Sequence, residues 1–227
     1  MRAFLFDIDG TLVDSSASIE RVWRQVAREF GVDEAEVLSK CHGRRDADVV
    51  EEFFKPEVRE AVVARVNVLD TEFVNGAVPT LGAPQLLATL ADGQWAAVTS
   101  GPRPLMAARL RAAGLPVPRV LITADDVRFG KPHPEGFLLA AAALGVPAAS
   151  CAVVEDSPAG VAAGKAAGAL VIAVTTTHPA DVLSEADVVV NDLSDLLDLP
   201  AGWAVSAGRP GGRRDEGGNR PGGLGPR

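Results

Sequence analysis

The stretch AVVEDSPAGVAAGKAAGALVIAV, residues 152–174, decides the fold class of this chain. It begins with the apolar run Ala152-Val153-Val154 and ends with the apolar run of residues 170–174, and the residues between them have helical character. Continuous apolar runs that alternate with helices are typical of parallel strands buried on both faces of a sheet. We therefore predict a strand, a helix over about 158–167 and a second, parallel strand.

The same alternation extends over the rest of the chain from about residue 85. Further strand-like runs lie at 2–6, 95–98, 120–122 and 188–190, and helix-like stretches lie near 103–113 and 135–144. With right-handed crossovers, this order predicts an α/β fold with a doubly wound, Rossmann-like parallel sheet. A Gly-x-Gly-x-x-Gly motif does not follow the first run, which argues against dinucleotide binding.

A helical block separates the first strand from the others. Ser15 or Ser16 is positioned to cap a first helix, Gly31 to end it, and further helical patterns lie near 34–40, 45–54 and 57–74. The block is too long for one crossover connection, so we expect residues 15–79 to form a small helical domain. Residues 1–14 and 80–204 then form the α/β core.

Composition excludes several classes of protein. The 227 residues carry a net charge of −8 and are 47% apolar, which is typical of a globular domain and disfavours nucleic acid as the main partner. We find neither an apolar run of the ~18 residues that a membrane span needs nor a secretory signal, so we expect no membrane association. The two cysteines, Cys41 and Cys151, favour free thiols and a cytoplasmic location.

The last residues differ in composition from the rest. Residues 205–227 contain eight glycines, three prolines and five arginines against one aspartate and one glutamate. Their charge of +3 leaves −11 on residues 1–204. Such a segment has too few apolar residues to offset its ordering entropy, and we predict a disordered tail.

Polar residues follow four of the predicted strands at the edge where ligands bind in open α/β sheets. They are Asp7-Ile8-Asp9-Gly10-Thr11, Thr99-Ser100-Gly101, Lys131 and Glu155-Asp156-Ser157. Converging carboxylates repel one another unless a hard divalent cation balances them, and oxygen ligands favour Mg²⁺.

The remaining groups at this edge favour an anion. Lys131, the Ser100 hydroxyl and backbone N–H groups around Gly101 are suitable donors to phosphoryl oxygens. Asp7 is a candidate nucleophile that forms an aspartyl-phosphate, and Asp9 is a candidate acid and base. Together these residue types indicate phosphoryl transfer.

Four segments also resemble the motifs of the haloacid dehalogenase-like hydrolases, in the same order and with similar spacing over about residues 1–195. They are the segment that begins Asp7-Ile8-Asp9-Gly10-Thr11, then Ser100 after a strand, Lys131-Pro132, and Glu155-Asp156-Ser157-Pro158-Ala159-Gly160. The resemblance implies that the helical block is a mobile cap.

The resemblance also implies a role for each motif residue. Asp7 would be the nucleophile and a Mg²⁺ ligand, and Asp9 the acid and base, with its backbone carbonyl on the metal. Ser100 and Lys131 would hold the phosphoryl oxygens. Asp156 would bind Mg²⁺, and Glu155 would support the metal directly or through water.

The cap segment from His42 to Asp48 is similar to the specificity loop of sugar- and polyol-phosphate phosphatases, which often reads Gly-x-Arg-x-x-Asp. This similarity makes His42, Arg44 and Arg45 candidate substrate-binding residues for a small phosphorylated metabolite. The related β-phosphoglucomutases tend to place the arginine one position later, where this chain has Asp46, and to have Gly-Val instead of Gly-Thr in the first motif.

These departures favour a phosphatase acting on a small sugar or polyol phosphate. A phosphosugar mutase and a non-catalytic phosphate-binding module are the alternatives. The architecture is often monomeric, and we expect a monomer here.

Overall fold

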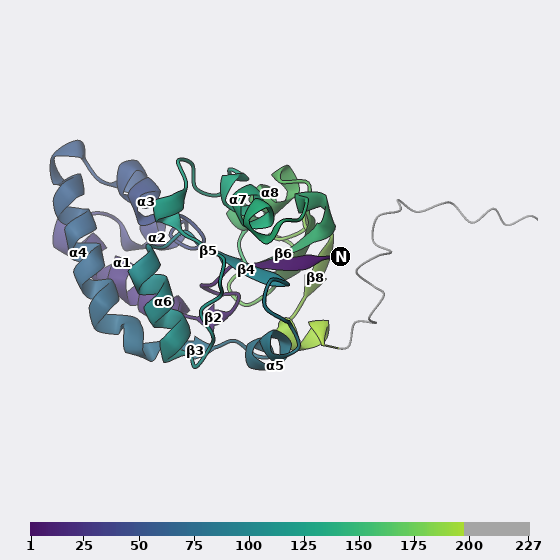
Figure 1. The fold of residues 1–227 in the computed structure, drawn as a ribbon. Coiled ribbons are helices and arrows are strands. Elements are labelled where there is room, and N and C mark those ends of the chain that lie inside the picture. Colours follow the sequence, from purple (N-terminus) through teal and green to yellow (C-terminus); the bar gives the residue numbers. More distant parts are fainter. Residues whose placement is uncertain (198–227) are drawn as a thin grey trace, which may run out of the picture.

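A computed structural model describes residues 1–197, and the predicted tail of residues 205–227 lies outside the described residues. The centre of the fold is a six-stranded parallel sheet with the strand order β5-β4-β1-β6-β7-β8 (Figure 1). The strands are β1 (Ala3–Phe6), β4 (Trp95–Val98), β5 (Leu121–Ile122), β6 (Cys151–Glu155), β7 (Leu170–Val174) and β8 (Val188–Val190). Every pairing in this sheet is parallel, which confirms the predicted fold class.

Helices cover both faces of the sheet because successive strand residues point to opposite sides. Helices α7 (Glu135–Leu144) and α8 (Pro158–Ala166) pack on the face that includes Leu5 and Val153. The opposite face, which includes Phe6, packs against α5 (Ala83–Ala88) and α6 (Arg103–Ala112) and against the 3-10 turn Leu193–Leu196. Both faces are therefore buried, as the continuous apolar runs require.

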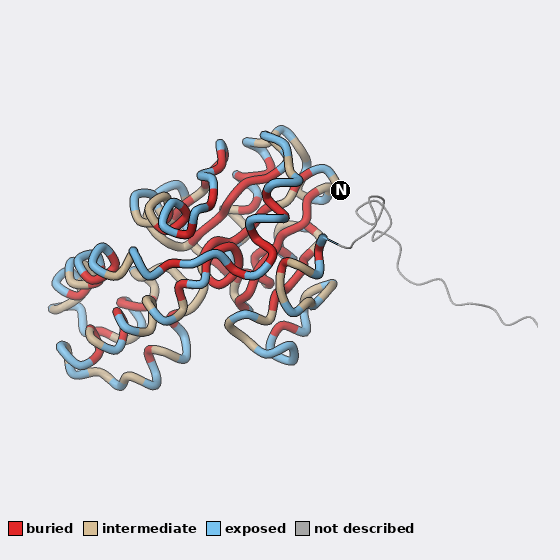
Figure 2. The backbone as a smooth tube through the Cα atoms, turned by 90° about the horizontal axis from the view of Figure 1, so that it is seen from below, coloured by how far each residue is buried: buried red, intermediate tan, exposed pale blue. Residues whose placement is uncertain are grey.

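The segment between β1 and β4 contains a helical insert with its own hydrophobic core. The insert consists of α1 (Ser16–Phe30), α2 (Glu34–Leu38), α3 (Asp46–Phe53) and α4 (Arg59–Phe73), together with the 3-10 turns Pro56–Val58 and Val74–Gly76. Its core includes Trp23, Phe54 and Leu69. Figure 2 shows buried stretches in the smaller lobe of the molecule, beside the larger buried region. Two short strands, β2 (Val13–Asp14) and β3 (Val78–Pro79), pair antiparallel where the chain enters and leaves the insert.

Most predicted elements lie within two residues of the observed ones, but two strands and one α-helix within residues 1–197 were not predicted. Strands β2 and β3 are only two residues long, and α5 begins after Gly82 in a segment that contains two prolines. Gly31 ends α1 in the left-handed conformation, with φ of 70°, as predicted. Within residues 1–197, the helices are too short or too polar to cross a bilayer.

Candidate active site

Three buried carboxylates meet at the carboxyl edge of the sheet. Asp7 directly follows β1, Glu155 ends the neighbouring strand β6, and Asp156 is the next residue. One oxygen from each side chain lies within 4.8 Å of the other two, and all three residues are buried. The first and fourth sequence motifs therefore come together because their strands are adjacent in the sheet.

Lys131 is the cation that faces this group. Its Nζ donates to the Asp7 carboxylate, to Glu155 Oε1 at 2.5 Å and to the carbonyl oxygen of Val98 at 3.3 Å. Burial alone would lower the pKa of Lys131, but Asp7 and Glu155 raise it, so the side chain stays protonated. The structure thus brings together the residues of the first, third and fourth motifs.

Glu155 is held by more hydrogen bonds than either of its acidic neighbours. Its Oε2 accepts from the backbone N–H of Asp156 at 3.0 Å, and from the N–H and hydroxyl of Ser157 at 3.1 and 2.9 Å. The Ser157 hydroxyl in turn accepts from the N–H of Gly160 and caps α8. An ideal Cβ on Gly160 would lie 1.8 Å from the Glu155 carboxyl carbon, so a glycine is needed at this position.

The three buried carboxylates of Asp7, Glu155 and Asp156, called the carboxylate trio below, have electrostatics that suit a bound divalent cation. Burial raises the pKa of Asp7 well above its ordinary value. Burial, with a smaller contribution from repulsion by Glu155, raises the pKa of Asp156 to about 7. One lysine cannot balance three carboxylates in a buried site, whereas a hard cation with oxygen ligands can. Gly10, with φ of 87°, lets the chain approach Asp156 closely, since a Cβ there would lie 2.1 Å from Asp156 Oδ2.

Asp9 is turned toward a different set of partners. Its Oδ1 accepts from the Ser15 hydroxyl at 2.6 Å, and its Oδ2 accepts from Arg109 Nη1 at 2.8 Å. Ser15 occupies the N-cap position of α1, but its hydroxyl makes no bond to the helix, contrary to the predicted capping role. Arg109 Nη2 also donates to Asp70 Oδ1 at 2.8 Å, so a buried arginine bridges Asp9 and helix α4 of the insert.

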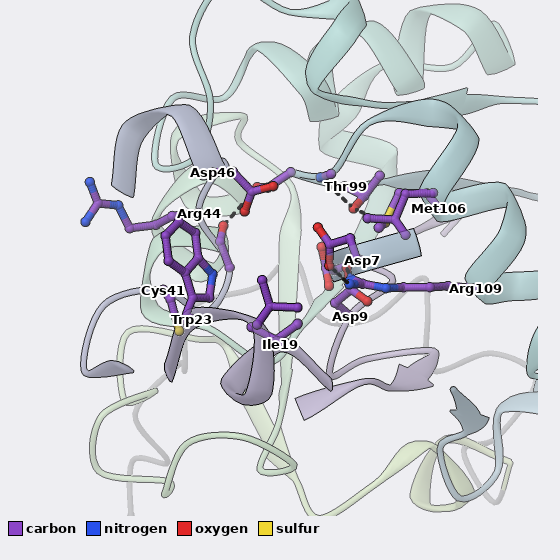
Figure 3. Close-up of a pocket in the computed structure, with 16 residues that line it drawn as sticks. Asp7, Asp9, Ile19, Trp23, Cys41, Arg44, Asp46, Thr99, Met106 and Arg109 are labelled. Carbon is purple, nitrogen blue, oxygen red and sulfur yellow. Dashed lines mark hydrogen bonds and ion pairs between the residues drawn. The ribbon is translucent and has the colours of Figure 1, made fainter. Parts of the chain in front are cut away.

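A cavity between the sheet edge and the insert contains Asp7 and Asp9 in its wall (Figure 3). Ile19, Trp23 and Met106 form apolar parts of the wall. Its polar lining residues are Asp7, Asp9, Asp46, Asp70, Thr99, Ser100, Arg44 and Arg109. The cavity is therefore mixed in character and rich in carboxylates, and it is closed in part by the insert.

Ser100 and Gly101 lie beside this cavity, as the second motif predicts. The Ser100 hydroxyl donates to the carbonyl oxygen of Gly43 at 2.9 Å, which joins the α/β core to the loop before α3. The N–H of Gly101 faces the hydroxyl of Thr99 at 3.2 Å. Both residues line the same cavity as Asp7, so their polar groups can bind an anion that displaces the Gly43 contact.

The three candidate substrate-binding side chains of the insert have other partners. Arg44 donates to Glu52 at 2.6 Å, and Figure 3 shows its guanidinium pointing away from Asp7 and Asp9. Arg45 forms a bidentate ion pair with Asp48 and also donates to the carbonyl of Arg128. His42 packs edge-to-face on His178. His42 and Arg45 do not line the cavity that contains Asp7.

Three charged residues of the cavity wall were missed by the sequence analysis, namely Asp46, Asp70 and Arg109. The spacing of two of them could have revealed their burial. Asp70 lies four residues after the apolar Val66, and Arg109 lies three residues after the apolar Met106, so each is on the apolar face of its helix. A charged residue on the apolar face of a predicted helix needs a buried partner. Burial, and then repulsion from Asp70, raises the pKa of Asp46 to about 7.

Comparisons with characterised proteins agree with this geometry. The family model of the haloacid dehalogenase-like hydrolases matches residues 1–168. Hexitol phosphatase A of Escherichia coli is 40% identical over 200 residues, which cover 86% of this chain and 93% of that protein. Validoxylamine A 7'-phosphate phosphatase of Streptomyces hygroscopicus is 39% identical over 200 residues, which cover 85% of this chain and 94% of that protein.

Solved structures share the fold. A hydrolase from Pseudomonas syringae superimposes with a TM-score of 0.79 at 24% identity, and the match covers 87% of this chain and 96% of that one. A β-phosphoglucomutase from Clostridium difficile gives a TM-score of 0.76 at 22% identity, covering 86% and 93%. The matched family model, the 40% identity to a curated relative and the shared fold lead to one conclusion: the chain belongs to the haloacid dehalogenase-like hydrolase family.

Proposed function

We propose that this protein is a metal-dependent phosphatase that hydrolyses a small sugar or polyol phosphate. The observation that carries the proposal is the position of Asp7, which contacts the protonated Lys131, lies within 4.8 Å of oxygens of Glu155 and Asp156, and lines a cavity. A carboxylate next to cationic groups is suited to attack a phosphoryl group, because they balance the charge of both reactants.

Mg²⁺ is the cofactor that we assign to the carboxylate trio. Asp7 and Asp156 would hold it together with the backbone carbonyl of Asp9, and Glu155 would support it directly or through water. When bound, the cation would neutralise charge on the transferring phosphoryl group and orient it. The all-oxygen donor set favours Mg²⁺ over softer metals.

The reaction that we propose has two steps on the side chains of this protein. An Asp7 oxygen attacks phosphorus, the bond from phosphorus to the ester oxygen breaks, and Asp9 donates a proton to the departing alcohol. Asp9 then accepts a proton from water as the water oxygen attacks phosphorus and releases phosphate from Asp7. Lys131, the Ser100 hydroxyl and the Gly101 N–H would hold the phosphoryl oxygens.

The cavity wall favours an alcohol with hydroxyl groups over one that carries a second anion. Both arginines in its lining are paired with carboxylates, Arg44 with Glu52 and Arg109 with Asp9 and Asp70. The Asp46 carboxylate lines the cavity, forms no hydrogen bond with the described residues, and can accept one from a substrate hydroxyl. A phosphosugar mutase must bind a bisphosphate, and this wall has no unpaired cation for the second phosphate.

The helical insert would act as the cap of this site. The contact from Ser100 to Gly43 closes the insert onto the phosphoryl-binding edge, so binding of a phosphate ester requires this contact to open. The closed insert would then exclude water while the leaving group departs.

Asp7→Asn tests the proposal and separates it from a non-catalytic phosphate-binding module. We expect turnover of small phosphate esters to be lost, because the amide is a far weaker nucleophile, while Asp14→Asn, an exposed change nearby, keeps wild-type activity. The measurement is phosphate release from hexitol, glycerol and sugar phosphates, with Mg²⁺ and with EDTA. Turnover that survives Asp7→Asn would contradict the assignment.

A further inference from the structure

We propose that Arg109 is a positioning residue that fixes the orientation of Asp9 and ties it to the helical insert through Asp70. The proposal rests on the function proposed above, in which Asp9 transfers the proton. It concerns a bridge of three side chains from three parts of the fold, the loop after β1, helix α6 and helix α4.

Arg109 is buried, which is unusual among the arginines within residues 1–197. Its side chain is only 5% exposed, and it makes ion pairs with both Asp9 and Asp70 at 2.8 Å. Burial alone would lower the pKa of Arg109, but the two carboxylates raise it, so the guanidinium remains charged. A buried charge of this kind is retained only where its partners compensate for desolvation.

The contacts of Asp9 leave its carboxylate little freedom. One oxygen accepts from Ser15 and the other from Arg109, and the two donors come from different elements, the residue before α1 and helix α6. Because the planar guanidinium presents its N–H groups at fixed angles, it orients a carboxylate better than a lysine does. Loss of Arg109 would leave Asp9 held on one side only.

Asp70 connects this arrangement to the insert. It lies on the buried side of α4, and α6 packs against the turn Val74–Gly76 that follows α4. Figure 3 shows the end of the Arg109 side chain beside Asp7 and Asp9. The position of the insert is thereby linked to the orientation of the side chain that protonates the leaving group.

The two steps of the proposed reaction provide a selective test. Protonation of the leaving group limits the first step for an alkyl phosphate such as sorbitol 6-phosphate. It does not limit that step for acetyl phosphate, because acetate is a weak base that leaves without a proton. Since kcat/KM reports only steps up to formation of phospho-Asp7, it isolates the acid role of Asp9.

We expect Arg109→Met to lower kcat/KM for sorbitol 6-phosphate about 100-fold, within the range for a misplaced acid or base. For acetyl phosphate, kcat/KM should stay within about threefold of wild type, whereas kcat falls for both substrates because water attack needs Asp9 as base. Arg109→Lys should recover part of the loss. Arg111→Met, an exposed change on the same helix, should match wild type.

An equal loss of kcat/KM for the two substrates would overturn the positioning role, as would no loss for either. If Arg109→Met does not fold, judged from its thermal melt, the same comparison on Arg109→Lys and Asp70→Asn decides the question. A wild-type protein that turns over neither substrate, or an Asp7→Asn variant that retains turnover, would refute the proposed function and not the bridge.

Discussion

Gly160→Ala should destabilise the protein severely because the new methyl group has no room beside Glu155. An ideal Cβ would lie 1.9 and 2.2 Å from the two carboxylate oxygens, whereas ordinary contacts begin near 3.4 Å. The carboxylate would have to retreat by roughly 1.5 Å, which is the difference between these contacts. Its Oε2 has three donors and its Oε1 accepts from Lys131, so a retreat breaks most of these hydrogen bonds.

The expected loss of unfolding free energy follows from the role of these hydrogen bonds, which compensate for the burial of the Glu155 charge. Disrupting a buried, hydrogen-bonded ion pair typically costs about 3–5 kcal/mol of unfolding free energy. For a domain of this size each kcal/mol corresponds to roughly 2–4 °C, so the midpoint of thermal unfolding should fall by roughly 6–20 °C. Phosphatase activity should fall with it, because Glu155 no longer orients Lys131 against Asp7.

A double-mutant cycle identifies the cause. Glu155→Ala removes the group that the methyl would meet, so adding Gly160→Ala to it should cost almost nothing further, and the coupling should be about 3 kcal/mol. Gly164→Ala is the matched control on the same helix, because the atoms nearest to its Cβ belong to the apolar side chains of Val153 and Val171. Its cost should add to that of Glu155→Ala. Additive costs for Gly160→Ala, or a wild-type unfolding midpoint for that variant alone, would refute the reasoning.

Two further predictions concern the charges of the site. Millimolar Mg²⁺ should raise the unfolding temperature of EDTA-treated protein, because it binds only the folded trio; a shift that persists unchanged in Asp156→Asn would place the ion elsewhere. Burial raises the folded-state pKa of Asp46 to about 7, above its unfolded value, so its contribution to stability is present at low pH and is lost as the pH rises from about 4 through 7. Asp46→Asn should therefore be more stable than wild type at pH 8, by roughly 1–2 kcal/mol after discounting for partial exposure, and should lose this advantage near pH 4, as thermal melts at the two pH values will show.

The sheet and the core of the site follow from local sequence pattern. Each buried strand is a continuous apolar run, and the candidate site residues Asp7, Ser100 and Glu155 lie at or just beyond the end of such a run. Because parallel strands present their carboxyl ends on one edge, sequence order alone predicts that these residues converge. The short strands β2 and β3 and helix α5 escaped prediction because they are held mainly by contacts with residues distant in sequence.

The sequence by itself determined the fold class, the family and the motif that contains the candidate nucleophile, because these depend on periodicity and on short runs of chemically specialised residues. Only the tertiary structure decided which charges face the cavity. Arg109 lies 39 residues after Asp70 and 100 residues after Asp9 in the sequence, yet its side chain contacts both carboxylates. The candidate arginines of the insert, in contrast, pair with nearby carboxylates. The direction of a side chain and its partner depend on how helices pack across the chain, and local spacing carries no information about that packing.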